Sequence, residues 1–364
     1  MCIRDSLDPW GSGIIEDEKY RRLIKEFGIS PLDELKHEIE NPDIYVRRGI
    51  DFGHRDLDKW LKDARKGNAA VLTGIKPSGR FHLGNLITAQ KLIHYQHTYN
   101  VTAFYTVADF EAFIDNHVPF EACIKYARDN VADLIALGLD VDNAYIYLQS
   151  QNTKVMKLCF LAASKVTNNM LKAVYGERSI GLYMCALVQV GDILLPQDEE
   201  FGGAKSVLVP VGIDQDPHIR LTRDIARKYN LIPPAAIYHK LLRGLGGKEK
   251  MSKRNPMSYI TLSDDERTLR KKIFAAFTGG KGTSEQQRRE GGNPEICSVF
   301  ELAKFFFVKD DGELKEIYDR CREGKILCGE CKNLIYQYAA AFLKEHRSKK
   351  SEAMKIAKRL VKQA

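Results

Sequence analysis

The chain has 364 residues and a formal net charge of +8. Its hydrophobic content of 44% and charged content of 29% are ordinary for a soluble globular protein of two or three domains. No apolar run approaches the length of a membrane span and no signal-peptide pattern opens the chain, so we expect a cytoplasmic location and no membrane partner. The positive charge fits a nucleic-acid partner without demanding one.

In chain order, residues 1–6 are interpreted as a sequencing or assembly scar, and residues 7–55 as a polar N-terminal extension. Helices are then expected at 19–27, 124–135 and 215–229, and strands at 69–74, 101–108, 144–148 and 206–211. This alternation predicts an α/β fold over residues 56–262, with a doubly wound parallel sheet of the Rossmann type. In such sheets, ligands bind beyond the carboxyl ends of the strands.

Strand signals stop after about residue 265. Helices are expected at 297–308, 314–321, 332–343 and 352–361. A helical second domain is therefore predicted over residues 263–364. Basic residues become more frequent toward its end. They are Lys344, His346, Arg347, Lys349, Lys350, Lys355, Lys358, Arg359 and Lys362. They form either a solvated helix face or a nucleic-acid-binding surface.

A first motif opens the helix that follows the strand at 69–74. It reads Pro77-Ser78-Gly79-Arg80-Phe81-His82-Leu83-Gly84-Asn85. Gly74 and Gly79 permit a tight turn and a close backbone approach. His82 lies where the free N–H groups and the dipole of a helix N-terminus favour an anion, although it can equally be a helix cap. Gly84 leaves room for a flat base or a ribose, and Asn85 can donate hydrogen bonds.

A second motif lies in a loop rich in glycine and lysine. It reads Lys250-Met251-Ser252-Lys253-Arg254. Such a loop can close over a triphosphate and bring Lys250 and Lys253 in as the transition state forms. The alternative is an exposed basic loop.

A third motif follows the strand at 206–211 and starts a helix. It reads Gly212-Ile213-Asp214-Gln215-Asp216-Pro217-His218. Asp214 can accept hydrogen bonds from ribose hydroxyls, and Gln215 can reach phosphate or substrate. An N-cap role for Asp214 is compatible with this pattern as well.

The first two motifs together resemble the HIGH and KMSKS signatures of class I aminoacyl-tRNA synthetases, with Asn85 and Arg254 as departures. Over nearly its whole length the chain resembles the tryptophanyl-tRNA synthetases of the archaeal and eukaryotic type. The segments that carry this resemblance are 8–10, 47–56, 212–224, 276–280 and 291–293. The resemblance implies that tryptophan reacts with ATP and Mg²⁺ to give tryptophanyl-adenylate and pyrophosphate, followed by transfer to tRNA(Trp). It also implies a helical anticodon-binding domain and a homodimer, with its interface around residues 115–190.

The amino-acid site is carried over from this family by position. Glu111 would hold the ammonium group, while Gln189 and Gln215 would contact the amino acid. Leu72 and Thr106 stand where the eukaryotic enzymes have the Tyr and Gln that accept the indole N–H.

The segment at 189–195 instead resembles the bacterial tryptophan enzymes, so Asp192 is the predicted indole acceptor. A buried carboxylate accepts equally well from a phenol, and tyrosyl enzymes also have a Gln–Asp pair here. This segment alone therefore leaves tryptophan and tyrosine open, and a surface position on an amphipathic helix is a third reading of Asp192.

Eight cysteines are present, and the last four stand apart from the others. These four are Cys297, Cys321, Cys328 and Cys331, separated by 23, 6 and 2 residues. Cys-x2-Cys is a common half of a metal site. The spacing resembles that of tryptophanyl-tRNA synthetases with a [4Fe–4S] cluster, with zinc as the second choice and four unrelated cysteines as the alternative.

Three other functions compete with this interpretation. A tyrosyl-tRNA synthetase is the nearest. Small adenylyltransferases share the His-x-Gly-His motif but lack the Lys-Met-Ser-Lys loop and the helical domain. A non-catalytic, RNA-binding iron–sulfur paralogue would have damaged motifs, and here the motif residues are intact, at His82, Gly84, Asp214, Gln215, Lys250 and Lys253.

Overall fold

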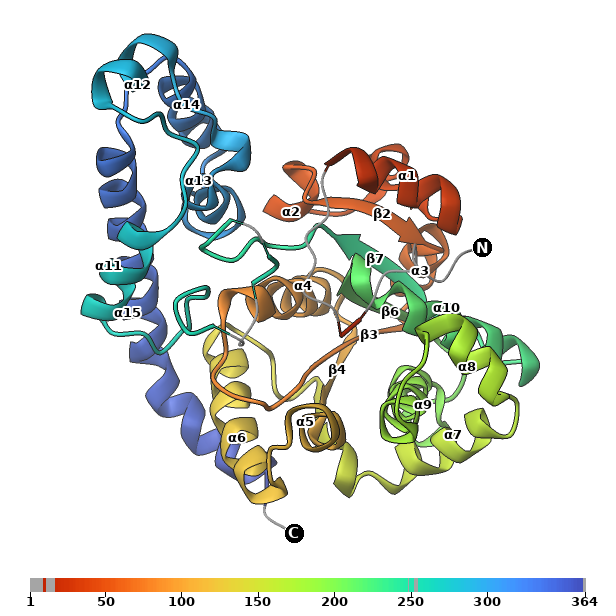
Figure 1. Cartoon of the computed structure of the whole chain (residues 1–364). Coiled ribbons are helices and arrows are strands. Elements are labelled where there is room, and N and C mark those ends of the chain that lie inside the picture. Colours follow the sequence, from red (N-terminus) through yellow and green to blue (C-terminus); the bar gives the residue numbers. More distant parts are fainter. Residues whose placement is uncertain (1–8, 11–16, 248, 252–254, 363–364) are drawn as a thin grey trace.

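The computed structural model describes residues 9–10, 17–247, 249–251 and 255–362. Over these residues a central sheet is covered by helices on both faces, and a helical unit projects from one side (Figure 1). The strands are β1 (Ser30–Pro31), β2 (Asp51–Arg55), β3 (Ala69–Ile75), β4 (Thr102–Val107), β5 (Ala144–Leu148), β6 (Ser206–Gly212) and β7 (Ala235–His239). The helices of the sheet region are α1 (Asp17–Phe27), α2 (Ile44–Arg47), α3 (Leu57–Ala64), α4 (Leu83–Tyr99), α5 (Asp109–Asn116), α6 (Phe120–Ala136), α7 (Thr153–Ala163), α8 (Asn168–Tyr175), α9 (Ile180–Leu194) and α10 (Asp216–Lys228). The helical unit comprises α11 (Glu266–Ala275), α12 (Ser284–Glu290), α13 (Ser298–Leu302), α14 (Asp311–Arg322) and α15 (Cys328–Leu360).

The sheet has the order β1-β2-β7-β6-β3-β4-β5. The five strands from β7 to β5 are parallel. The chain moves outward from β3 through β4 to β5 and then returns to place β6 on the other side of β3. The connections after β3 and β6 therefore diverge from neighbouring carboxyl ends, which is the switch point where doubly wound sheets bind ligands. The predicted fold class is confirmed.

Alternate residues along each strand belong to two hydrophobic cores, one on each face of the sheet. On β3, Val71 and Ile75 belong to the core on one face, while Ala70 and Leu72 belong to the core on the other. Successive strand residues point to opposite faces, so a strand buried on both sides must be apolar throughout. Helices α3, α4 and α6 cover the first face, and α7, α9 and α10 cover the second.

The N-terminal extension contributes more than a packed helix. The predicted helix is present as α1, but β1 and β2 were not expected. β2 pairs antiparallel with β7 and extends the sheet at its edge. Its polar run, Asp51 to Arg55, hid the strand, because these side chains are satisfied by partners far along the chain.

The helical unit departs from expectation at its end. The two predicted helices at 332–343 and 352–361 form one helix, α15, of 33 residues. The polar run between them contains no Gly or Pro to stop a helix, and His346 and Ala353 are buried within it. α15 packs along α6, where Lys350 pairs with Asp133 at 2.9 Å.

One helical stretch passes the length and composition test for a membrane span, contrary to the sequence-based expectation. It covers Ile180–Gln197, and 72% of it is buried inside the protein. It contains α9, which packs on α7 and α10 over one face of the sheet. This stretch is a core helix of the fold.

Candidate active site

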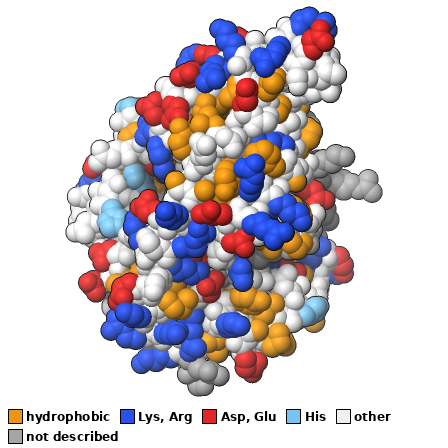
Figure 2. Space-filling model, turned by 90° about the vertical axis from the view of Figure 1, so that its left-hand side faces the viewer, with side chains coloured by type: hydrophobic (Ala, Val, Ile, Leu, Met, Phe, Trp, Pro, Cys, Tyr) orange, Lys and Arg blue, Asp and Glu red, His pale blue; other side chains and the backbone are white. Residues whose placement is uncertain are grey.

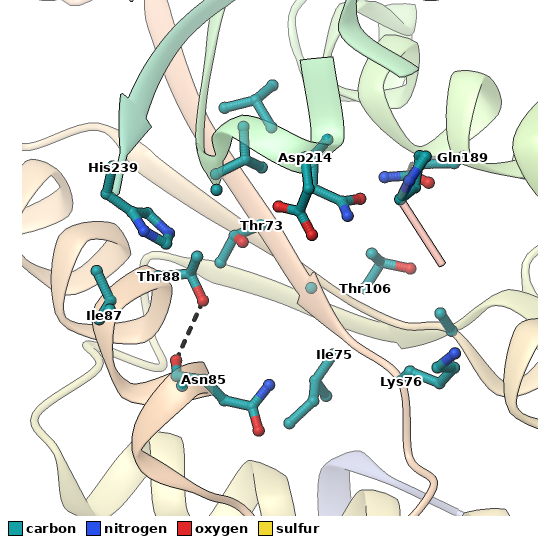
Figure 3. A pocket seen from close by; sticks show the side chains of 18 of the residues that line it. Thr73, Ile75, Lys76, Asn85, Ile87, Thr88, Thr106, Gln189, Asp214 and His239 are labelled. Atoms are coloured by element: carbon teal, nitrogen blue, oxygen red, sulfur yellow. Dashed lines mark hydrogen bonds between the residues drawn. The ribbon is translucent and has the colours of Figure 1, made fainter. Parts of the chain in front are cut away.

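A cavity of about 320 Å³ opens at the carboxyl ends of β3 and β6 (Figure 3). It is lined by 14 of the predicted site residues, namely Leu72, Gly74, His82, Gly84, Asn85, Thr106, Glu111, Gln189, Asp192, Gly212, Asp214, Gln215, Lys250 and Met251. Pro77, Ser78 and Gly79 form the turn before α4 and do not line it. Ser252, Lys253 and residues 1–6, which the sequence analysis interprets as a scar, lie outside the described residues. Residues from five separate segments thus meet in one pocket.

His82 is both a helix cap and a pocket residue. Its Nδ1 accepts a hydrogen bond from the Gly84 N–H at 3.0 Å, and Asn85 Oδ1 accepts from the His82 N–H at 3.4 Å, which forms a capping box. Because Nδ1 is an acceptor, the ring proton is on Nε2. His82 therefore brings an N–H donor to the N-terminus of α4, where an anion is already favoured.

Asp214 and Lys250 meet across the pocket. The Lys250 Nζ donates to Asp214 Oδ2 at 2.6 Å. A Cβ on Gly212 would lie 2.6 Å from Asp214 Oδ1, so only glycine fits beneath this carboxylate. The second motif and the third motif are thus in contact, as a shared ATP site requires.

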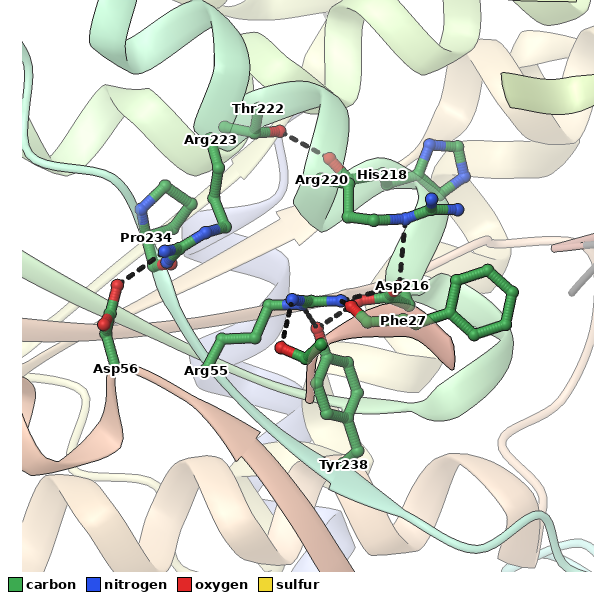
Figure 4. Close-up of polar contacts among 11 residues, drawn as sticks. Phe27, Arg55, Asp56, Asp216, His218, Arg220, Thr222, Arg223, Pro234 and Tyr238 are labelled. Atoms are coloured by element: carbon green, nitrogen blue, oxygen red, sulfur yellow. Dashed lines mark hydrogen bonds and ion pairs between the residues drawn. The ribbon is translucent and has the colours of Figure 1, made fainter. Parts of the chain in front are cut away.

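The turn that carries Asp214 is held from below by Asp216, the first residue of α10. Arg55 donates to Asp216 through Nε at 2.8 Å and Nη2 at 3.1 Å, and Tyr238 donates at 2.6 Å (Figure 4). Arg220 also pairs with Asp216, at 3.0 Å. Asp216 is 1% exposed, and its charge is matched by two guanidinium groups. This network fixes where Asp214 and Gln215 enter the pocket.

Asp192 is fully buried at the other end of the pocket. It accepts hydrogen bonds from Thr106 Oγ1 at 3.1 Å, from the Tyr147 hydroxyl at 2.9 Å and from Gln149 Nε2 at 2.6 Å. Burial raises the pKa of Asp192 to about 7, although these three hydrogen bonds act in the opposite direction. A carboxylate has about four acceptor positions, so one remains for a ligand. The surface alternative for Asp192 is wrong.

Glu111 lines the pocket but already has partners. Its Oε1 accepts from Lys76 Nζ at 3.2 Å and from the indole Nε1 of Trp10 at 3.0 Å. The Trp10 ring also lies against Tyr175 and His218, with ring centroids 5.5 and 5.6 Å away. The predicted ammonium-binding carboxylate is therefore in contact with the N-terminal segment.

Comparisons with known proteins agree with this geometry. The family described as "tRNA synthetases class I (W and Y)" matches residues 64–344. The tryptophan–tRNA ligases of Aeropyrum pernix and Methanocaldococcus jannaschii are 44% and 40% identical to the chain, and each alignment covers 98% of both sequences. The chain belongs to the tryptophan–tRNA ligase family. The crystal structure of the tryptophanyl-tRNA synthetase from Aeropyrum pernix superposes with a TM-score of 0.90, covering 97% of this chain and 98% of that one.

The sequence did not indicate several residues in or next to the pocket. Gln149 lines it just after β5, and Tyr147 on β5 donates to Asp192 from behind the lining, and neither belongs to a motif that the family resemblance carries. Thr88 and His239 also line or edge the cavity (Figure 3). The sequence indicates these residues only by their position, because each lies near the carboxyl end of a parallel strand or on the first turns of α4.

The four family-like cysteines line a second, small cavity of about 20 Å³. All four are free thiols, and burial raises the pKa of Cys321 to about 11 and that of Cys331 to about 12. Glycine at this position lets a cysteine sulfur lie close to the backbone. A Cβ on Gly280 would lie only 2.5 Å from Cys328 Sγ. Across the described part of the chain, however, no three His, Cys, Asp or Glu side chains form a group that could hold a metal ion.

Proposed function

We propose that this chain is a tryptophan–tRNA ligase that activates tryptophan with ATP and transfers it to tRNA(Trp). The observation that carries the proposal is one pocket lined by His82, Asp214 and Lys250 at one end, where Lys250 contacts Asp214, and by Asp192 at the other. The first end suits a nucleoside triphosphate and the second a buried N–H donor. Family membership supports tryptophan as that second ligand.

Activation is an in-line attack of the tryptophan carboxylate on the α-phosphate of ATP, with pyrophosphate leaving. Negative charge grows on the phosphate oxygens, so the residues needed are positioned donors and cations. His82 Nε2–H and the N-terminus of α4 supply donors, and Lys250 supplies charge. Mg²⁺ enters with ATP as part of the substrate.

In this proposal Asp192 orients tryptophan by accepting the indole N–H. Thr106, Tyr147 and Gln149 hold the carboxylate in place, so the remaining acceptor position is fixed before the ligand arrives. Glu111 would hold the substrate ammonium, together with Gln189 and Gln215. The contacts from Trp10 and Lys76 both go to Glu111 Oε1, so Oε2 is the oxygen that would accept from the substrate.

Amino-acid-dependent ATP–pyrophosphate exchange tests this proposal, with tryptophan and tyrosine assayed side by side. We expect exchange with tryptophan only. Exchange with tyrosine would keep the fold and replace the substrate. Absence of exchange with both, in folded protein, would favour the non-catalytic RNA-binding alternative.

For tRNA we propose the basic face along α15. Figure 2 shows Lys and Arg side chains gathered on the side of the molecule that this helix crosses. The exposed basic residues at its end are Lys344, Lys349, Lys355, Lys358, Arg359 and Lys362. Replacing Lys355, Lys358 and Arg359 by Ala should weaken tRNA binding and its salt dependence while leaving ATP–pyrophosphate exchange unchanged. Equal tRNA affinity would exclude this face.

We also propose a homodimer through the apolar surface near α5, α7 and α9. Large apolar side chains are exposed there, with Phe160 at 71% and Ile180 at 79%. Phe113 on α5 and Met184 on α9 are also exposed, at 44% and 38%. Such a patch favours burial against a second copy. Analytical ultracentrifugation should give a dimer for the wild type and a monomer for Phe160→Glu with Ile180→Lys.

For the four cysteines we propose a bound metal group. The residue types fit, because four thiols line one cavity, although as they lie they do not form a group that could hold an ion. Gln287 Nε2 is buried there with no hydrogen-bond partner among the described residues and can donate to a thiolate. The family resemblance favours [4Fe–4S], while a cavity of about 20 Å³ has room for a single zinc ion unless the cysteine segments move apart.

Anaerobic purification distinguishes these metal groups. An absorbance near 400 nm with about four irons per chain would identify the cluster, and stoichiometric zinc would identify the ion. Cys328→Ser should lose the group, and Cys159→Ser, in the sheet core, should keep it. No metal in either case would overturn the proposal.

The proposed domains are the extension at 7–55, the catalytic domain at 56–262 and the anticodon-binding domain at 263–364. A cytoplasmic location accompanies the proposed function, because charging of tRNA serves protein synthesis there.

A further inference from the structure

His239, the last residue of β7, points its ring into the active-site cavity. It is 5% exposed, and its Nδ1 lies 2.9 Å from the Lys240 carbonyl oxygen. A carbonyl oxygen only accepts, so Nδ1 carries the ring proton and Nε2 presents a lone pair. No hydrogen-bond partner of His239 Nε2 is present among the described residues. The pocket thus contains a buried acceptor with nothing to accept from.

The surroundings keep this imidazole neutral. Burial lowers the pKa of His239 to about 4, and the buried ammonium of Lys91 acts in the same direction. Lys91 is held beneath the pocket by its ion pair with Asp51, the residue opposite His239 on β2. The Lys240 carbonyl and the Asp214 carboxylate act in the opposite direction but do not reverse the shift. His239 therefore stays an acceptor at neutral pH.

The position of His239 selects the part of the substrate that it meets. Figure 3 shows His239 and Gln189 at opposite ends of the pocket, with Asp214 between them. His239 lies on the side of Thr88 and of α4, the helix that His82 caps, and away from Gln189, which is one helical turn before Asp192 on α9. A Cβ on Gly212 would lie 2.6 Å from Asp214 Oδ1 and 3.5 Å from His239 Cε1. The two acceptors thus share the space above one glycine.

We propose that His239 Nε2 accepts a hydrogen bond from one hydroxyl of the ATP ribose, beside the carboxylate of Asp214. A ribose offers two adjacent O–H donors, which two adjacent acceptors match. His82 and His239 then have opposite tautomers and opposite roles: His82 donates toward phosphate and His239 accepts from the sugar. The inference rests on the proposed function only in taking ATP as the nucleotide.

Calorimetric binding of Mg²⁺–ATP, 2′-deoxy-ATP and 3′-deoxy-ATP tests the assignment, using the full-length protein. His239→Asn keeps a donor for the Lys240 carbonyl and removes the acceptor, while His239→Gln keeps an acceptor near the Nε2 position. His97→Asn, on the exposed side of α4, is the matched control. Binding is measured without tryptophan, so a protein that fails the exchange assay still gives a reading.

We expect His239→Asn to weaken ATP binding about five- to tenfold, as loss of one neutral hydrogen bond predicts. His239→Gln should recover most of the affinity, and His97→Asn should bind like wild type. With the deoxynucleotide that lacks the partner hydroxyl, wild type and His239→Asn should bind equally.

Two results would overturn the assignment. One is a His239→Asn penalty that persists in full with both deoxynucleotides, or is absent with ATP itself. The other is a penalty that disappears with purine riboside triphosphate, which would place the contact on the adenine amine. Normal ATP binding without tryptophan-dependent exchange would instead refute the proposed function and leave the His239 result standing.

Discussion

The two ends of the active-site pocket are built differently. At the proposed tryptophan end, Asp192 accepts from Thr106 on β4, from Tyr147 on β5 and from Gln149 just after β5, which leaves one acceptor position for a ligand. At the proposed nucleotide end, His239 Nε2 has no hydrogen-bond partner within the described part of the chain, and Lys250 reaches Asp214 from a loop rather than from a strand or helix. The first end is preorganised for a ligand with a single N–H, and the second completes its contacts only when a highly charged ligand arrives. We therefore expect the Asp192 end to select the amino acid and the other end to stabilise the transition state.

The largest expected effect lies at the nucleotide end. Lys250→Ala should lower kcat of ATP–pyrophosphate exchange by about 100- to 1000-fold, the usual loss when one positioned transition-state donor is removed. KM for tryptophan should stay within about twofold, because uniform binding is untouched. Exposed Lys271→Ala on α11 is the control. An equal loss in tryptophan binding would remove the distinction between the two ends.

At the tryptophan end, Asp192→Asn should raise KM for tryptophan by about 10- to 100-fold, because hydrogen bonds to charged groups are worth about 1.5–3 kcal/mol. KM for ATP should not change. Steady-state exchange at saturating ATP measures the first value, and at saturating tryptophan the second. A variant with normal KM for tryptophan would place the indole acceptor elsewhere, with Gln149 the next residue to replace.

The raised pKa of Asp192 predicts a pH dependence. Its carboxylate form accepts the indole N–H, so kcat/KM for tryptophan should rise about tenfold between pH 6 and pH 8 for a pKa of about 7. Asp192→Asn should be flat over this range. A wild-type profile without this rise would mean that Asp192 is ionised throughout.

Asp192 also predicts a pH dependence of the free energy of unfolding, opposite in direction to that of kcat/KM. The ordinary pKa is 3.8 and the folded value is about 7, so the folded state holds its proton at pH values where the unfolded state has lost it. The contribution of Asp192 therefore lowers the free energy of unfolding as pH rises from about 4 to about 7. Denaturant unfolding of Asp192→Asn should show less of this decline than wild type.

The smallest expected effect tests the donors around Asp192. Tyr147→Phe removes one hydrogen bond to the carboxylate, which should raise the pKa of Asp192 further and move the pH profile of kcat/KM upward by less than about one unit. Tyr145→Phe, on the same strand but away from Asp192, is the matched control. An unshifted profile for Tyr147→Phe would show that Thr106 and Gln149 suffice.

Motifs that pair a fixed spacing with a helix or strand end could be predicted from the sequence. His82, Asp214 and Lys250 were found in this way, because a turn and a helix N-terminus leave local signals. Tyr147 and Gln149 could not be, since both contact Asp192 more than 40 positions away. His239 could not be either, because only the sheet order places the end of β7 beside Gly212. β2 was missed for the same reason: its polar side chains are satisfied only by tertiary partners. The predicted break in α15 is wrong, because the polar run between the two predicted helices consists of residues that favour a helix.

The length of α15 has a mechanical consequence. Its first turns carry Cys328 and Cys331, and its second half is held to α6 by His346 and Lys350. At 1.5 Å per residue its 33 residues span about 50 Å. A helix without an internal break behaves as a stiff rod. α15 therefore fixes the distance between the cysteine cavity at its first turns and its contacts with α6.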